Sequence, residues 1–319
     1  MREAQQERNR WKLSPCWCHS KKLAGACCLS GDRWHKPPTK VKLRLRSTTP
    51  SLDRCYMREL GSCEPPISGE HLISEGVLNV LRAGGDFTVS GLPWLEAGET
   101  KKLASGNLTA KCLCKGHNSA LSPLDEFAVL FFSVLKQCLT DVGTSNADLD
   151  RFERRSPDIA LLVAGHDLER WLLKTFKAMA SSGNLASGRM KLPDLFQRDV
   201  DVIAMLEEPA KWPPGTGLYF VMPPGSRFVN NDRIRIQPWY GDNQNELIGL
   251  WTSFLGFEFV LMIAAPDLSR SPALGQWLHR PGRIKVKFGQ SKRIIELSWT
   301  DRLRHPAITA NFDRSVSRP

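Results

Sequence analysis

Four cysteines near the start of the chain have the spacing of a metal site. Cys16 and Cys18 are separated by one residue, and Cys27 and Cys28 follow after eight more. Four thiolates can surround Zn²⁺ at about 2.3 Å in a tetrahedron that leaves no open position for a substrate. A segment this short cannot bury a core of its own, so a bound metal would stabilise its fold. The spacing therefore predicts a structural zinc site.

A second group of possible ligands is spread more widely. Cys55 and Cys63 flank a turn, and Cys114 and His117 form a C-x2-H pair. Two ligands from a turn and two from a later pair make a closed site that joins a β-hairpin to a helix. Cys112 could replace Cys114 as a ligand, and that alternative stays open at the level of sequence. We expect a second structural zinc site here.

Three residues beside the second group could carry out chemistry. Glu70 and Asn118 offer hard oxygen ligands, which Mg²⁺ accepts while it takes further oxygens from a phosphate. His71 could take a proton from an attacking water, and the cation, Mg²⁺ or Mn²⁺, would stabilise the leaving oxygen. The residue types therefore predict a metal-assisted hydrolytic centre.

The first group resembles the SEC-C motif, a small zinc element appended to many bacterial proteins. The motif reads C-x-C-x8-C-[C/H] and carries a Gly-Ser-Gly-Lys-Lys loop, where this chain has His19-Ser20-Lys21-Lys22. The resemblance implies bound zinc, a bacterial or phage-associated protein and a possible protein partner at this element.

The second group, over about residues 53 to 135, resembles the HNH or ββα-metal nucleases of the recombination-endonuclease-VII type, a treble-clef-like fold. The resemblance implies that Glu70 and Asn118 bind the catalytic cation and that His71 is the general base. Asn107 would orient His71. The implied zinc ligands are Cys55, Cys63, Cys114 and His117. The implied activity is endonucleolytic hydrolysis of phosphodiester bonds, with DNA as the expected substrate.

Four departures from the nuclease pattern keep a second hypothesis open. His117 stands in place of a fourth cysteine, Glu70 stands where aspartate is common, and two spacings differ. Seven residues separate Cys55 from Cys63 where two are usual, and the loop from His71 to Asn107 is unusually long. The alternative is a catalytically inactive zinc-binding adaptor that binds nucleic acid or a protein partner.

The elements that must position these residues are predicted from local patterns. Ser122 could cap a helix with Pro123 in its first turn, and a second helix is expected over 156–180, with His166 exposed to solvent. Alternating apolar residues after Gly215 predict half-buried antiparallel strands. The expected strands are 217–222, 233–240, 257–264, 283–289 and 293–299. The apolar run 247–265 contains Glu258, so two strands broken at Leu255-Gly256 are favoured over a membrane span.

Charge is distributed unevenly in the 319-residue chain, which has 44 basic and 33 acidic side chains. Residues 1–46 carry twelve basic and three acidic side chains, and residues 267–319 carry eleven and four. Basic ends favour contact with the nucleic-acid backbone, and the alternative is a pair of solvated basic tails. The absence of an apolar leader segment and the clustered thiols indicate a cytoplasmic protein without a membrane association.

The predicted fold class is α+β, divided into four parts. They are a SEC-C-like zinc element with a basic linker (1–46), an HNH-like ββα-metal domain (47–140), a helical segment (141–205) and an antiparallel β-rich domain of unknown role (206–319).

Overall fold

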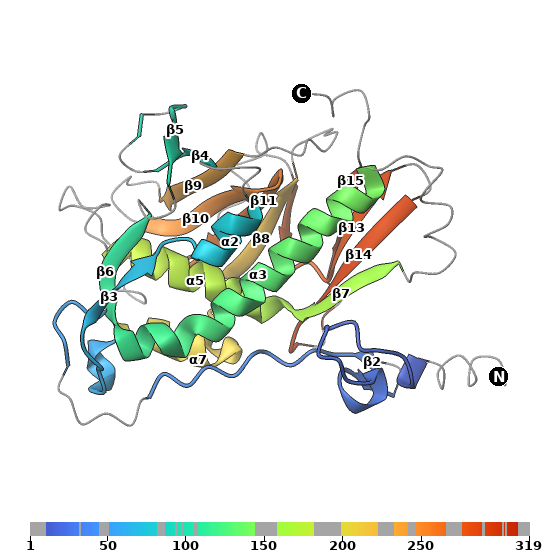
Figure 1. Cartoon of the computed structure of the whole chain (residues 1–319), viewed down its shortest axis with the longest axis horizontal. Coiled ribbons are helices and arrows are strands. Elements are labelled where there is room, and N and C mark those ends of the chain that lie inside the picture. Colours follow the sequence, from blue (N-terminus) through green and yellow to red (C-terminus); the bar gives the residue numbers. More distant parts are fainter. Residues whose placement is uncertain are drawn as a thin grey trace.

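The computed structural model confirms the α+β class: in the part of the chain that it describes, four helices accompany two larger sheets and two small ones (Figure 1). It describes residues 11–31, 33–44, 51–81, 87–92, 95–96, 98–104, 108–143, 158–181, 199–222, 233–241, 247–265, 276–288, 291–301, 303 and 305–311.

The largest sheet has seven strands in the order β12-β8-β11-β10-β9-β4-β5. Its strands are β4 (Phe87–Ser90), β5 (Thr100–Leu103), β8 (Gly217–Met222), β9 (Arg233–Tyr240), β10 (Leu247–Phe254), β11 (Phe257–Met262) and β12 (Gln276–His279). The run 247–265 divides as expected, because Leu255 and Gly256 adopt φ values of 55° and 82° in a tight turn between β10 and β11. Among the described residues, no helix has the length and apolar character needed to cross a membrane.

The second sheet has the order β15-β13-β14-β7. Its strands are β7 (Ile159–Ala164), β13 (Arg283–Phe288), β14 (Ser291–Ser298) and β15 (Ala307–Asn311). The expectation of purely antiparallel pairing needs correction, since β7 pairs parallel to β14, β15 parallel to β13, and β4 parallel to β9. Alternation of apolar residues reports which face of a strand is buried and carries no information about the direction of its neighbour.

The helices begin elsewhere than the sequence predicts. Helix α3 (Lys115–Gly143) starts seven residues before Ser122 and includes His117, so Pro123 lies inside the helix. Proline removes the hydrogen bond to the carbonyl four residues back, and the Ser122 hydroxyl donates to that Ser119 carbonyl at 2.8 Å instead. The local substitution explains why the helix continues through the proline.

The helix predicted over 156–180 begins later than expected, because the residues before Gly165 include a strand. Residues Ile159–Ala164 form strand β7, and helix α5 (Gly165–Ser181) follows directly. A continuous apolar run fits a buried strand as well as a buried helix, so periodicity could not separate the two. The remaining helices are α2 (Glu75–Leu81) and α7 (Asp199–Glu207).

The small elements belong to the segments that carry the two groups of possible metal ligands. Strands β3 (Ile67–His71) and β6 (Thr109–Cys114) pair antiparallel, and α3 follows β6 without a gap. Strands β1 (Leu29–Ser30) and β2 (Arg33–Trp34) pair antiparallel in the N-terminal element. The short 3-10 helices are η1 (Ala24–Ala26), η2 (Arg58–Leu60) and η4 (Pro209–Lys211).

One apolar core joins α3 and α5 to the large sheet. Phe132 lies at its centre, with ring centroids 5.1 Å from Phe254, 5.8 Å from Phe259 and 5.5 Å from Trp171. The same core extends along the chain from Val41 to Ala310. Strands β4 and β5, from the predicted nuclease segment, share the large sheet with the C-terminal strands.

Candidate metal-binding and catalytic site

The second group of ligands comes together in the interior. Cys55, Cys63, Cys114 and His117 are all buried. The Nδ1 atom of His117 lies 3.5, 3.9 and 3.2 Å from the sulfurs of Cys55, Cys63 and Cys114. Ligands bound to zinc at about 2.0 to 2.3 Å in a tetrahedron have separations of this size. The cluster could hold a zinc ion, and Cys114, rather than Cys112, belongs to it.

The ionisation of this cluster depends on a cation. Burial raises the pKa of the Cys55 thiol to about 12 and lowers the pKa of His117. A neutral imidazole is ready to bind a metal, but a buried thiol must lose its proton to do so. Zinc would supply the positive charge that stabilises the thiolates in this apolar setting.

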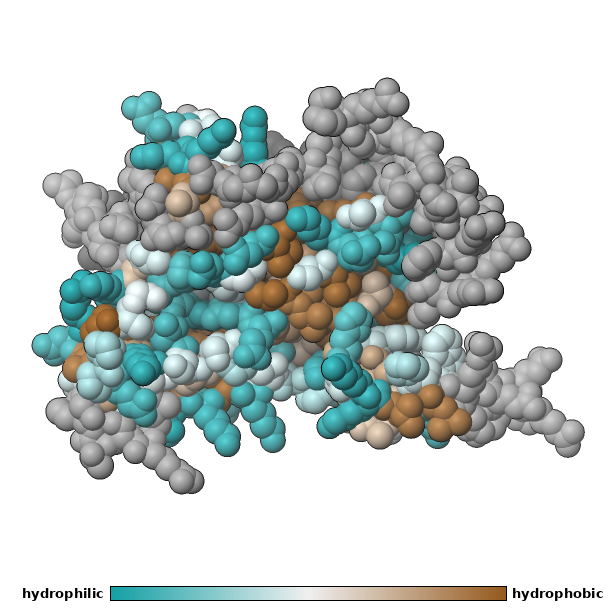
Figure 2. Space-filling view, in the orientation of Figure 1, coloured by the Kyte–Doolittle hydropathy of each residue, from teal (hydrophilic) through white to brown (hydrophobic). Residues whose placement is uncertain are grey.

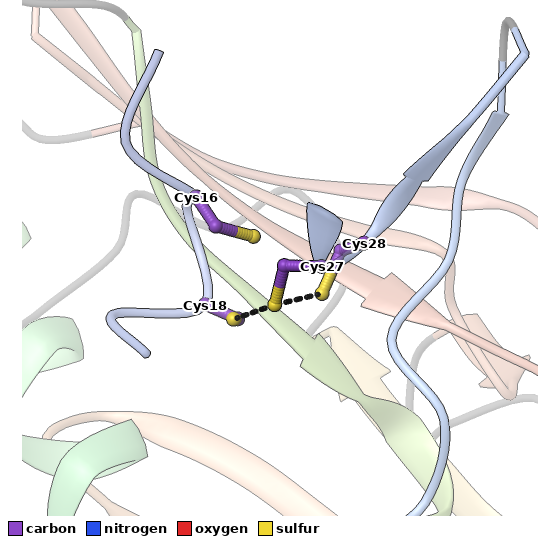
Figure 3. Close-up of side chains that lie close together, drawn as sticks. All are labelled: Cys16, Cys18, Cys27 and Cys28. Atoms are coloured by element: carbon purple, nitrogen blue, oxygen red, sulfur yellow. Dashed lines mark hydrogen bonds between the residues drawn. The ribbon is translucent and has the colours of Figure 1, made fainter. Parts of the chain in front are cut away.

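The first group also forms a cluster (Figure 3). The Cys27 sulfur lies 3.5 Å from that of Cys18 and 3.6 Å from that of Cys28, and Cys16 points toward the same space. These separations again suit four thiolates around zinc. The positions of all four cysteines follow the prediction from their spacing.

The N-terminal element with Cys16, Cys18, Cys27 and Cys28 lies against the outer edge of the second sheet. The Leu162 N–H of edge strand β7 donates to the Trp17 carbonyl at 3.0 Å, and His19 Nε2 donates to the Ala160 carbonyl at 2.9 Å. The Leu162 side chain packs among the cysteines of the element. An exposed strand edge offers unpaired backbone groups to other chains. The N-terminal element therefore protects part of this edge.

A pocket of about 580 Å³ lies between β3, the start of α2, the N-terminal half of α3 and α5. It brings together three predicted catalytic residues, Glu70, His71 and Asn118; the fourth, Asn107, lies outside the described residues. Its lining consists of Gly69, Glu70, His71, Ser74, Glu75, Gly76, Asn118, Ser119, Ser122, Asp125, Glu126, Val129 and Lys174. Figure 2 shows hydrophilic residues (teal) gathered over the N-terminal part of α3.

The carboxylate of Glu70 is almost completely buried in the pocket wall. Only 2% of the residue is exposed, and Lys174 Nζ lies 2.7 Å from its Oε1. Burial raises the pKa of Glu70, and the neighbouring Lys174 ammonium opposes that rise. Burial alone would lower the pKa of Lys174, but Glu70 and Asp125 together hold it above its ordinary value. The Lys174 ammonium is thus stabilised by two carboxylates, which repel each other.

A chain of hydrogen bonds fixes the other partner of Lys174. Trp171 Nε1 donates to Ser74 Oγ at 2.8 Å, and Ser74 Oγ donates to Asp125 Oδ1 at 2.6 Å. The second oxygen of Asp125 accepts from Lys174. Lys174 was not among the residues predicted from the sequence. A lysine on the apolar face of a helix was the available signal, because Lys174 follows Trp171 by one helical turn.

Asn118 is oriented by a similar bond. Its Nδ2 atom donates to Ser68 Oγ at 3.2 Å, and Ser68 Oγ donates to the Leu113 carbonyl at 3.2 Å. The amide nitrogen is thereby held toward β3 and β6, which turns the amide oxygen the other way. Both Glu70 and Asn118 can present oxygen to a cation, so their chemistry suits Mg²⁺ or Mn²⁺.

The expectation that His166 is exposed needs correction. His166 is buried, with Nδ1 at 2.8 Å from Glu169 Oε2 and Nε2 at 2.9 Å from Thr300 Oγ1. Its polar neighbours in sequence suggested solvent, but α5 is buried along almost its whole length. His166 belongs to a buried polar cluster that joins α5 to β8 and to the segment around Arg280.

Comparison with known proteins finds no matching family model, no matching curated protein and no matching solved structure. Function is therefore inferred from the geometry of the pocket and the two clusters.

Proposed function

We propose that this protein is a metal-dependent endonuclease that hydrolyses phosphodiester bonds in nucleic acid, with His71 as the general base. One observation carries the proposal: Glu70, His71 and Asn118 line a single pocket. Helix α3 forms one wall of this pocket, and its first turn carries His117 of the buried cysteine and histidine cluster. The antiparallel pair β3 and β6, followed at once by α3, supports the resemblance to ββα-metal nucleases.

Each residue has a defined role in the proposed reaction. Glu70 and Asn118 hold the cation, which when bound stabilises the negative charge on the leaving oxygen. His71 takes a proton from the water that attacks phosphorus, and the P–O bond to the leaving oxygen breaks. The cluster of Cys55, Cys63, Cys114 and His117 would hold zinc as a structural ion and would fix the start of α3 against β3.

The charge of the pocket explains why a cation is needed. Its lining has four carboxylates, from Glu70, Glu75, Asp125 and Glu126, against the single ammonium of Lys174. A phosphodiester carries negative charge and would be repelled by such a surface. A bound divalent cation would reduce this excess of negative charge and would place positive charge next to the phosphate.

An exposed row of positive charge supports nucleic acid as the partner. Residues 35–44 form an extended segment, here called the basic strap, that runs from the first zinc element beneath α3 and α7 (Figure 1). Val41 and Leu43 are buried, whereas Lys40, Lys42 and Arg44 are exposed. The strap thus presents its cations on one side, as a phosphate backbone requires.

The backbone of the first zinc element supports its resemblance to the SEC-C motif. His19 and Lys21 have φ values of 57° and 61°, in the left-handed region that favours glycine. These are the two positions at which the Gly-Ser-Gly loop of the motif has glycine. A protein partner at this element remains part of the proposal.

The test is cleavage of plasmid DNA by the zinc-loaded protein in Mg²⁺ or Mn²⁺. We expect nicked and linear products with the wild type and at least about a hundredfold slower cleavage with His71→Ala, since general-base catalysis contributes about 10² to 10⁴. His305→Ala is the matched control, because His305 contacts Asp301 away from the pocket.

Cleavage that His71→Ala leaves unchanged would refute the assignment of His71. A complete lack of cleavage, together with salt-sensitive binding of DNA, would favour the alternative zinc-binding adaptor.

A further inference from the structure

We propose that Lys174 is a resident counter-ion of the cation site: it holds the Glu70 carboxylate while no divalent cation is bound and releases it when one binds. The inference rests on the proposed function, because Glu70 is there a cation ligand. It assigns to α5 a part in controlling cation affinity that the nuclease resemblance does not include.

The contact geometry makes Lys174 and a divalent cation competitors. The Lys174 ammonium lies 2.7 Å from Glu70 Oε1, and only 3% of Lys174 and 2% of Glu70 are exposed. Mg²⁺ binds oxygen at about 2.0 to 2.1 Å and brings two positive charges with it. Two cations on one nearly buried carboxylate would repel each other strongly in this low-dielectric setting.

The pocket provides a second place for the displaced ammonium. Lys174 also donates to Asp125 Oδ2, and Asp125 is fixed through Ser74 to Trp171. Lys174 can therefore give up Glu70 and keep Asp125. When Lys174 leaves Glu70, its ammonium stays paired with the Asp125 carboxylate. The exchange therefore avoids the free-energy cost of an unpaired buried charge.

The burial of Glu70 supports the same exchange. Only 2% of Glu70 is exposed, so water cannot replace the positive charge beside its carboxylate. Lys174 supplies the compensating charge until the divalent cation arrives. Removing Lys174 should accordingly leave a pocket that is more negative and binds a divalent cation more tightly.

The first test measures Mn²⁺ binding to the zinc-loaded full chain by calorimetry and by the electron paramagnetic resonance of free Mn²⁺. We expect Lys174→Met to bind Mn²⁺ at least about tenfold more tightly than the wild type, because one nearby positive charge is removed. Glu70→Gln should lose this binding, which locates the site. Lys136→Met is the matched control, since Lys136 donates to the Val80 carbonyl outside the pocket and should leave Mn²⁺ affinity unchanged.

The outcomes separate the inference from the proposed function. If the wild type binds Mn²⁺ through Glu70 but Lys174→Met binds it no more tightly, competition is overturned and the nuclease proposal stands. If neither protein binds Mn²⁺ in a way that depends on Glu70, both the cation site and the competition are overturned.

A second measurement keeps the wild-type side chain in place, in case Lys174→Met does not fold. Lysine labelled with ¹⁵N gives an ammonium resonance for a buried, ion-paired side chain, and Lys174→Arg identifies the resonance of Lys174. We expect this signal to shift and saturate as Mg²⁺ is added. A resonance unchanged at Mg²⁺ concentrations that saturate the site would overturn the exchange of partners.

Discussion

Glu169 is a buried carboxylate that joins three parts of the chain. Its oxygens accept from the Leu218 N–H at 2.9 Å and from Arg280 Nε at 2.7 Å, and one contacts His166 Nδ1 at 2.8 Å. Gly217 permits this approach, because its φ of 111° and the closeness of Glu169 Oε1 to the position of a Cβ both exclude a side chain. A single residue thus ties α5 to β8 and to the segment after β12.

The ionisation of Glu169 should make stability depend on pH. Burial alone would raise the pKa of Glu169, but His166 and Arg280 outweigh it and hold the pKa below its ordinary value. A depressed pKa gives stability that is complete above the unfolded-state value and is lost as the pH falls through the folded-state value. Glu169→Gln should lower the free energy of unfolding by about 3 to 5 kcal/mol at neutral pH.

Urea unfolding of the zinc-loaded proteins between pH 7.5 and 4 measures this effect. The difference between wild type and Glu169→Gln should stay constant down to about pH 5.5 and narrow below about pH 4.5. Glu296→Gln is the control, because the side chain of its partner Arg283 is 42% exposed and ion pairs in contact with solvent contribute little. A difference that widens toward acid would contradict the assignment.

At the scale of elements, the basic strap is held to the body by its backbone. The Thr39 N–H and hydroxyl donate to the Asp167 carboxylate at 3.0 and 2.7 Å, and the Lys36 N–H donates to Ser298 Oγ at 3.2 Å. These bonds use backbone groups and a hydroxyl, so the exposed lysines at 40 and 42 are not needed to hold the strap. Their charge is available for a polyanion.

Neutralising the strap should weaken nucleic-acid binding in a way that depends on salt. Each phosphate contact contributes about 0.9 to the slope of log affinity against log salt for duplex DNA, so Lys40→Gln with Lys42→Gln should reduce the slope by roughly 2. Fluorescence anisotropy with a labelled duplex at several salt concentrations gives the slope. Lys101→Gln with Lys102→Gln removes two exposed charges from β5 and is the control. If the two double variants reduce the salt slope equally, the effect comes from the net charge of the protein and not from a contact with the basic strap.

At the scale of the whole molecule, the two clusters of possible metal ligands belong to different hydrophobic cores. Cys55, Cys63 and Cys114 lie within the large core that extends from Val41 to Ala310. The four cysteines of the N-terminal element pack in a separate small core with Leu162. Loss of metal should therefore have different consequences at the two clusters.

Zinc analysis and urea unfolding of two variants distinguish these consequences. The wild type should contain about two zinc ions per chain, given two closed four-ligand clusters. Cys16→Ser with Cys18→Ser should remove one of them and change the unfolding of the large core little. Cys63→Ser should remove the other and destabilise the whole chain, because structural zinc contributes folding energy directly. Similar unfolding curves for the two variants would show that the cores are coupled.

Local spacing determined the parts of the site that are close in sequence. The pairs Cys16-x-Cys18 and Cys114-x2-His117 predicted ligands that do converge, because one turn brings such side chains within a few ångströms of each other. The strands 217–222 and 233–240 were predicted for a similar reason, since alternation directly reports a half-buried strand. Helix starts were less accurate, because the tertiary contacts of β7 and α3 overrode local signals.

The sequence by itself thus determined which residues form the two clusters of possible metal ligands, and it determined most of the strands. Both features depend on residues that are close along the chain. Only the tertiary structure decided that Lys174 contacts Glu70 and that β4 and β5 join the sheet of the C-terminal strands. It also decided that the N-terminal cysteine element covers the edge of β7. These contacts join residues far apart in sequence. Their formation depends on the burial of α3 and α5 in a shared core, which no local pattern records.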